Sequence, residues 1–269
     1  MQEEICSVID SGSTRASADA LVSQEPSPIR ENWMHPIRWI PPNAGSLLDI
    51  GCNVGELLGY CREVYPSIQL SGVEVNQLAL EKARQNLPDA QLHFAGAQSL
   101  PFPDASFDCV TCIEVLEHIP GNLRKQCLAE IRRVLRRGGR LVLRVPHAGM
   151  FAFLDSNNFR FRAPGLYRAL LKTGRRDQGY AAVSEDVVWH QHFTKEELQE
   201  LLGAGWELET SRTGGLLLFP VSDLALWPFY RKQWTNNFVY KWLHRISNFD
   251  IGCDYGRASF DILMVLKRA

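Results

Sequence analysis

The stretch LLDIGCNVGE at residues 47–56 constrains the fold more than any other part of the sequence. An apolar run of strand length ends there in a turn that contains Gly51 and Gly55, and a helical pattern, ELLGYCREVY, follows directly. A ligand that approaches the backbone of such a turn needs glycines, because a side chain would block it. The N-terminus of the next helix adds free N–H groups for a bound carboxylate. The stretch therefore predicts a strand, a turn and a helix with a ligand at the turn.

Strand and helix patterns alternate after this unit. Helices are predicted over 76–87, with Asn76 as N-cap, from Gly121 to just before Gly138, and again from Thr194. The strand patterns lie at 46–51, 68–74, 90–96, 107–116, 140–145, 206–213 and 259–268. Alternating strands and helices form βαβ units with right-handed crossovers. We expect an α/β fold with a doubly wound, mostly parallel seven-stranded sheet.

The pattern becomes irregular in two places, after strands five and six. Residues 1–28 also lack periodicity and are predicted to be a flexible N-terminal tail. Residues 29–269 then form one domain with cap insertions at 147–190 and 213–257. Because ligands of open parallel sheets bind at the carboxyl ends of the strands, we expect both insertions to cover the ligand site.

The details of the glycine turn distinguish between cofactors. A dinucleotide fingerprint has glycines where this turn has Asn53 and Glu56. An acidic Glu56 beside a pyrophosphate would be repulsive, whereas S-adenosylmethionine (SAM) has no phosphate. Asn53 also accepts a positive φ more readily than most residues. Glu74 follows Gly55 by nineteen residues, at the end of strand two, where an acid can accept both ribose hydroxyls.

Four segments together resemble the type 11 (ubiquinone/menaquinone-biosynthesis-like) family of class I SAM-dependent methyltransferases, which have a Rossmann-like fold. The segments are LLDIGCNVGELL, GVEVNQLALEKAR, SLPFPDASFDCVTCIEVLEHI and LRRGGRLVLRVP. The resemblance covers residues 45–147 closely and implies a methyl-transferring enzyme that converts SAM to S-adenosylhomocysteine. It implies that Asp49, Gly51 and Gly55 shape the methionine side of the cofactor site and that Glu74 holds the ribose. It also implies that Ala97 and Gln98 border the adenine and that Cys112 and Ile113 pass under the methionyl group. Cys52, Asn53 and Val75 complete the implied set of cofactor-binding residues.

One departure from the family concerns the adenine. Family members often have an aspartate at the end of strand three, and this sequence has Gly96 there. Adenine recognition then rests on backbone groups and Gln98.

A hydroxyl acceptor benefits from a general base, and histidine suits that role near neutral pH. His118, His147 and His192 are the candidate catalytic residues, and His190 lies in the same stretch as His192. Glu114, Glu117 and His118 also form an E-x-x-E-H pattern, which resembles the metal site of small-RNA-end methyltransferases and some quinone-pathway O-methyltransferases. No metal is favoured, since such letters recur widely, but a divalent ion on these three residues is the alternative.

The second cap insertion is rich in aromatic residues and has no acid between Leu224 and Phe249. Aromatic rings mixed with cations suit an amphiphilic acceptor or a membrane interface, although a packed core is the competing interpretation. The function predicted is O-methylation of a small-molecule, glycolipid or other amphiphilic acceptor. The alternatives are C- or N-methylation of a quinone-like ring or amine, and a non-catalytic SAM-binding protein.

The net charge and the cysteines limit the partners and the cellular compartment that we expect. The formal net charge of -1 gives no electrostatic footprint for nucleic acid. Seven cysteines, an odd number without a compact framework, are typical of reduced thiols, and no signal peptide or spanning segment stands out. We expect a cytoplasmic protein, with residues 224–249 as the surface for any peripheral contact at the inner membrane face.

Overall fold

The structure is a computed structural model that describes residues 34–155, 158, 162–163, 190–216 and 237–269. The predicted tail at 1–28 lies outside these residues. So do most of the first cap insertion and the first part of the aromatic stretch, including Trp227, Phe229, Tyr230 and Trp234.

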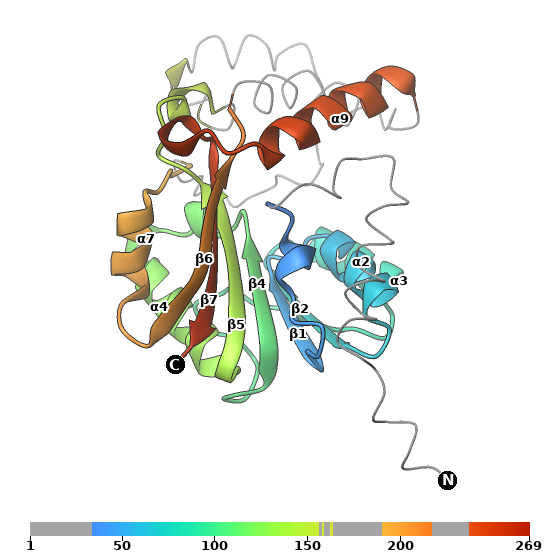
Figure 1. The fold of residues 1–269 in the computed structure, drawn as a ribbon. Helices are drawn as coiled ribbons and strands as arrows, with labels where there is room; N and C mark the ends of the chain where they lie inside the picture. Colours follow the sequence, from blue (N-terminus) through green and yellow to red (C-terminus); the bar gives the residue numbers. More distant parts are fainter. Residues whose placement is uncertain (1–33, 156–157, 159–161, 164–189, 217–236) are drawn as a thin grey trace.

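The fold is built on one seven-stranded sheet in the order β3-β2-β1-β4-β5-β7-β6 (Figure 1). Strands β1 to β5 run parallel, and β7 runs antiparallel to both β5 and β6. The predicted doubly wound sheet is therefore confirmed. The strands are β1 (Ser46–Ile50), β2 (Gln69–Glu74), β3 (Gln91–Phe94), β4 (Phe107–Ile113), β5 (Leu135–Pro146), β6 (Trp206–Gly214) and β7 (Asp261–Arg268).

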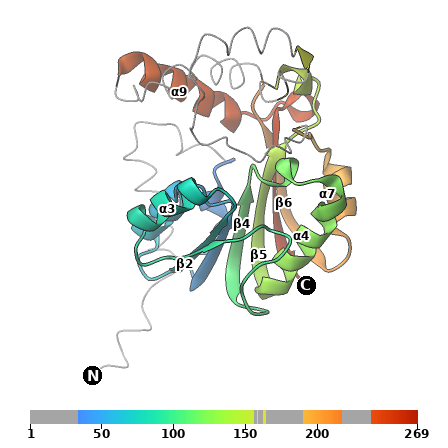
Figure 2. The ribbon, with the colours of Figure 1, turned by 180° about the vertical axis from the view of Figure 1, so that it is seen from behind.

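Helices cover both faces of the sheet, as the two opposite views show (Figures 1 and 2). Two separate apolar clusters fill the spaces between the helices and the sheet, one containing side chains of α4 and α7 and the other side chains of α2 and α3. The α-helices are α2 (Glu56–Val64), α3 (Gln77–Asn86), α4 (Gly121–Val134), α7 (Lys195–Leu202) and α9 (Phe238–Gly252). Short 3-10 turns are η2 (Pro36–Trp39), η3 (Leu116–His118), η4 (Ala152–Leu154) and η6 (Gly256–Ala258).

Local signals set the starts of α3 and α7. The Asn76 side chain accepts hydrogen bonds from the first turn of α3, as predicted. Thr194 and Glu197 form a reciprocal capping box at the start of α7. The prediction that α4 continues up to Gly138 is wrong, because Leu135 is already extended and pairs with Phe107 of β4. Pairing with a neighbouring strand outweighs the helical pattern there.

The first described segment is held against the sheet by two arginines of β5. Arg140 donates to the carbonyl of Trp39 at 2.9 Å, and Arg144 donates to the carbonyl of Met34 at 3.2 Å. Met34 is buried in the same apolar cluster as Ile251 from the end of α9. These contacts join η2, β5 and α9 near the carboxyl ends of the parallel strands.

No helix within the described residues combines the length and the apolar character needed to cross a bilayer.

Candidate functional site

The glycine turn between β1 and α2 has the geometry that the sequence predicts. Gly51, Asn53 and Gly55 all have positive φ values, of 71°, 49° and 85°. A Cβ on Gly51 would lie 2.5 Å from the side chain of Val115, which follows β4. Position 51 therefore tolerates only glycine, and the turn lies directly against the loop after β4.

Glu74 lies at the rim of this turn. One carboxylate oxygen accepts a hydrogen bond from the backbone N–H of Asn53 at 2.9 Å. The other accepts from the N–H groups of Val75 and Asn76, both at 2.8 Å. The carboxylate thus joins the end of β2 to the glycine turn, at the position where the sequence predicts a ribose contact.

Asp49 lies beneath the turn, at the end of β1. It is buried and accepts a hydrogen bond from Thr111 Oγ1 at 2.7 Å. Burial raises the pKa of Asp49 to about 7, although the Thr111 bond acts in the opposite direction. Of the other predicted contact residues, Cys52 and Cys112 are buried, whereas Ile113 is only partly buried.

The loop that is predicted to border the adenine has Gly96 where the resembling family often has an aspartate. The side chain of Gln98 fills the space beside Gly96, with its oxygen 2.4 Å from where a Cβ would stand. Ala97 is buried between them. Gln126 of α4 donates to the carbonyl of Gln98 at 3.0 Å and holds this loop in place. The position of the Gln98 side chain therefore depends on the glycine at position 96, because any larger residue there would displace the Gln98 amide.

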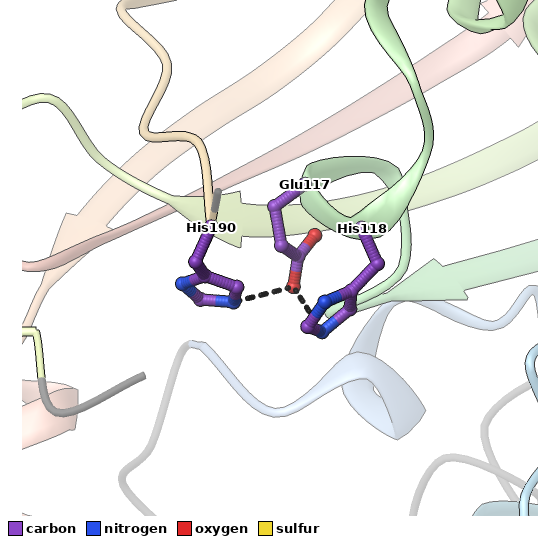
Figure 3. A group of neighbouring side chains, drawn as sticks. All are labelled: Glu117, His118 and His190. Carbon is purple, nitrogen blue, oxygen red and sulfur yellow. Dashed lines mark ion pairs between the residues drawn. The ribbon is translucent and has the colours of Figure 1, made fainter. Parts of the chain in front are cut away.

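A second polar cluster begins at η3, three residues beyond Ile113 (Figure 3). Glu117 is fully buried, and its carboxylate accepts no hydrogen bond from any side chain or backbone group in the described chain. The same carboxylate oxygen lies 3.6 Å from His190 Nε2 and 3.8 Å from His118 Nε2. The His118 side chain is 45% exposed, whereas that of His190 is 6% exposed. His118 is therefore the accessible end of this group.

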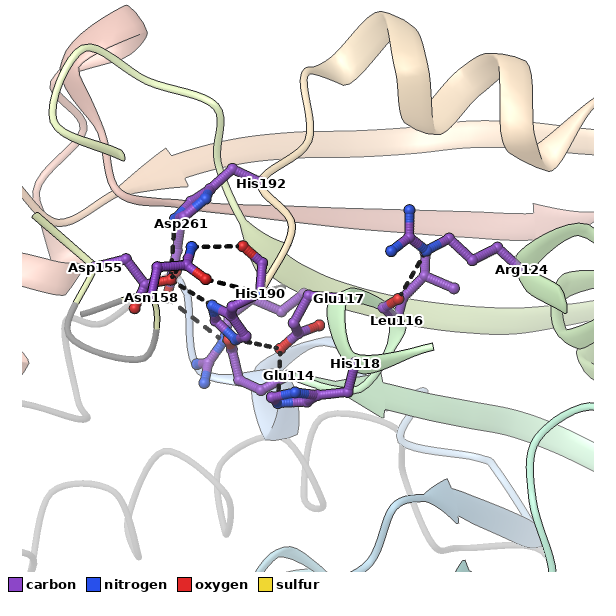
Figure 4. A network of polar contacts seen from close by, with 11 residues as sticks. Glu114, Leu116, Glu117, His118, Arg124, Asp155, Asn158, His190, His192 and Asp261 are labelled. Atoms are coloured by element: carbon purple, nitrogen blue, oxygen red, sulfur yellow. Dashed lines mark hydrogen bonds and ion pairs between the residues drawn. The ribbon is translucent and has the colours of Figure 1, made fainter. Parts of the chain in front are cut away.

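The cluster continues from His190 to the first cap insertion (Figure 4). His190 Nδ1 lies 2.5 Å from Asp155 Oδ2, and His192 Nε2 lies 3.3 Å from the same oxygen. Asn158 donates to the carbonyl of His190 at 2.7 Å and accepts from its N–H at 2.9 Å. Asp155 and Asn158 thus fix the position of the His190 ring.

Burial and charge together set the protonation of this cluster. Burial alone would lower the pKa of His190, but the carboxylates of Asp155 and Glu117 outweigh it and raise this pKa to about 10. Burial also raises the pKa of Glu117, and the neighbouring charge of Glu114 adds to this effect. For His192, burial dominates and lowers the pKa to about 4. The two carboxylates therefore favour the protonated form of His190, whereas burial favours the neutral form of His192.

The predicted residues separate into different environments. Glu114 has a positive φ of 54°, and its carboxylate pairs with Arg144 at 2.9 Å rather than joining Glu117 and His118. His147 bonds through Nδ1 to the carbonyl of Ser259 at 3.0 Å. Of the three candidate bases, only His118 combines exposure with a buried carboxylate. The third member of its group is His190, not Glu114.

Sequence reasoning missed Asp155 and Asn158. Both lie in the irregular insertion, where no periodicity or motif distinguishes them from other polar residues. Arg124 of α4 was also missed. It donates to the carbonyls of Leu116 and Ile119 and to the Gln191 side chain, and so holds η3 beside the segment that carries His190.

Known proteins match the part of the chain that carries the turn. A family model described as "Methyltransferase domain" matches residues 48–143. The O-methyltransferase cnsE of Penicillium expansum is 36% identical over 113 residues, which are 40% of each chain. The demethylmenaquinone methyltransferase of Thermotoga maritima is 30% identical over 131 residues, 49% of this chain and 53% of that protein. The chain thus spans about half or less of the length of these relatives.

Solved structures support the same fold over more of the chain. A putative sarcosine dimethylglycine methyltransferase from Galdieria sulphuraria has a TM-score of 0.55 at 10% identity and covers 84% of this chain and 78% of its own. A SAM-dependent methyltransferase from Methanosarcina mazei has a TM-score of 0.51 at 19% identity, covering 87% and 97%. At these identities the likeness concerns the fold alone.

Proposed function

We propose that this chain, in which residues 48–143 form a type 11 domain of the class I SAM-dependent methyltransferases, methylates a hydroxyl oxygen of a small-molecule or amphiphilic acceptor. The position of His118 is the observation that supports an oxygen as the methylated atom of the acceptor. Its half-exposed imidazole lies beside the buried carboxylate of Glu117, in the loop that contacts the glycine turn through Val115.

The residues of the turn fit SAM. Gly51 lets the Val115 side chain pack directly against the backbone of the turn, and Glu74 presents a carboxylate at the predicted ribose position. When bound, SAM supplies a methyl group on a positively charged sulfur, which is already activated for displacement. The remaining work of the protein is to hold the acceptor in line and to remove its proton, and correct positioning alone contributes up to about 7–11 kcal/mol.

His118 is the group that we assign to proton removal. A neutral imidazole accepts the hydroxyl proton as the oxygen attacks, and the Glu117 carboxylate stabilises the resulting imidazolium. Glu117 is held in turn by His190, and His190 by Asp155. These three residues orient the base without touching the acceptor.

Binding measurements test the cofactor assignment. We expect SAM and S-adenosylhomocysteine to bind with micromolar affinity and NAD not to bind. The reason is the acidic Glu56 and the non-glycine Asn53 at positions where a pyrophosphate requires glycines. Isothermal titration calorimetry with each ligand gives the answer, and NAD binding as tightly as SAM would refute the assignment.

A divalent metal ion is a second arrangement of the same site. The observation that favours it is the buried carboxylate of Glu117, which no hydrogen bond from the described residues satisfies, with two imidazoles directed at it. Its donor set of one carboxylate and two imidazoles suits a transition metal. A metal ion would have to displace the proton that the neighbouring carboxylates favour on His190, so the two arrangements exclude each other.

Chelation separates the two arrangements. After dialysis against EDTA, we expect the enzyme to retain full methyl transfer from labelled SAM to its acceptor fraction. A matched sample dialysed without EDTA is the control. Loss of turnover that added Mg²⁺, Mn²⁺ or Zn²⁺ restores would establish the metal arrangement instead, with Glu117, His118 and His190 as ligands.

A further inference from the structure

Helix α9 exposes three large aromatic side chains. Phe238 is 81% exposed, Trp242 52% and Phe249 60%. The residues are four and seven positions apart, so at 3.6 residues per turn they lie along one face of the helix. A folded protein rarely leaves such a row in water without a partner.

The same face carries positive charge. Lys241 and Arg245 are both exposed and lie next to the aromatic row by helical spacing. The one acidic residue of α9, Asp250, is buried and accepts hydrogen bonds from the Tyr255 hydroxyl and the Leu216 N–H, both at 2.9 Å. The exposed face is therefore apolar and cationic, although the chain as a whole has a net charge of -1.

The helix is fixed at the edge of the sheet where the candidate site lies. Its C-terminal end is anchored because Ile251 is buried against Met34 and the Asp250 carbonyl accepts from Gly215. Figure 1 shows α9 above the carboxyl ends of the strands, with its N-terminal end directed away from the sheet. The aromatic row thus lies on a helix whose C-terminal end is attached to the sheet.

From this arrangement we propose that α9 docks on an anionic lipid bilayer. Phe238, Trp242 and Phe249 enter the boundary between headgroups and acyl chains, and Lys241 and Arg245 contact lipid phosphates. Helices that lie in the plane of a membrane combine aromatic rings on one side with cations at its border. Charge complementarity selects an anionic bilayer over a neutral one, since each cation near the surface strengthens binding about fivefold.

This inference goes beyond the proposed function, because docking needs neither SAM nor turnover. It places the candidate site at the bilayer surface, where an acceptor with a lipid tail is concentrated.

Vesicle co-sedimentation tests the proposal with the full chain. We expect wild type to sediment at low salt with phosphatidylcholine vesicles containing phosphatidylglycerol, and much less with phosphatidylcholine alone. The double variant Trp242→Ser/Phe249→Ser should bind the anionic vesicles at least about tenfold more weakly. Lys241→Ala/Arg245→Ala should bind about 25-fold more weakly and lose its dependence on salt.

Two matched controls remove similar groups elsewhere on the surface. Phe94→Ser removes an aromatic residue that is 60% exposed on the edge strand β3, and Lys125→Ala removes an exposed cation from α4. Both should bind vesicles as wild type does. Circular dichroism checks that every variant is folded.

Three results would overturn the proposal. The first is wild type that stays in the supernatant with anionic vesicles at low salt. The second is binding that both double variants retain in full. The third is a wild-type dimer that the Trp242→Ser/Phe249→Ser variant dissociates, without vesicle binding, because the aromatic row would then be an interface between two copies. Calorimetry with S-adenosylhomocysteine on the same samples keeps a failure of docking distinct from a failure of the proposed function.

Discussion

Replacing His118 with alanine is expected to lower kcat by about 10²–10⁴-fold while the affinity for S-adenosylhomocysteine stays unchanged, as general base catalysis contributes roughly this much. His118 is half-exposed beside Glu117 and belongs to no part of the glycine turn, so its loss removes proton transfer and not cofactor binding. The measurement is transfer of labelled methyl from SAM into the acceptor fraction of an extract, with mass spectrometry of the product.

Two further variants make this result specific. Glu117→Gln keeps the shape of the buried side chain but removes its charge, and should lower kcat less than the loss of His118 does. His147→Ala serves as the control, because His147 is bonded to the Ser259 carbonyl and we assign it no role in proton transfer. A His118→Ala enzyme with undiminished kcat would remove the base from the mechanism and favour a carbon or nitrogen acceptor. Absence of turnover in wild type with every extract would favour the non-catalytic alternative.

Replacing Glu74 with alanine is expected to weaken binding of S-adenosylhomocysteine at least tenfold, because charge-assisted hydrogen bonds are stronger than neutral ones. The loss is about 10²-fold where the carboxylate accepts hydrogen bonds from both ribose hydroxyls. Glu74→Gln should lie between the alanine variant and wild type. Glu81→Ala removes another acid nearby, on the exposed surface of α3, and is the matched control. Isothermal titration calorimetry gives the affinities.

The structure adds a second readout for Glu74. Its carboxylate also holds the N–H groups of Asn53, Val75 and Asn76, so the alanine variant should have a lower melting temperature even without ligand. A variant that melts earlier but binds S-adenosylhomocysteine as tightly as wild type would show that Glu74 stabilises the turn and does not hold the ribose.

The sheet and the cofactor turn could be predicted from the sequence because their determinants are local. The run LLDIG is a buried strand by its apolar pattern, and Gly51 and Gly55 adopt the positive φ values that the turn requires. Glu74 is placed by the simple rule that parallel neighbours end at the same edge, and β1 and β2 are such neighbours. The prediction for the end of α4 was wrong for the opposite reason, because the pairing of Leu135 with Phe107 depends on a strand elsewhere in the chain.

The acid and histidine cluster was decided only by tertiary structure. In the sequence, Glu114 and Glu117 are equivalent members of E-x-x-E-H. In the fold, the positive φ of Glu114 and the guanidinium of Arg144 draw one carboxylate away, while burial and two imidazoles surround the other. Asp155 and His190 are 35 residues apart and meet through an insertion without a repeating pattern. Side-chain partners at such separations depend on how distant segments pack, and no local pattern of residues records that packing.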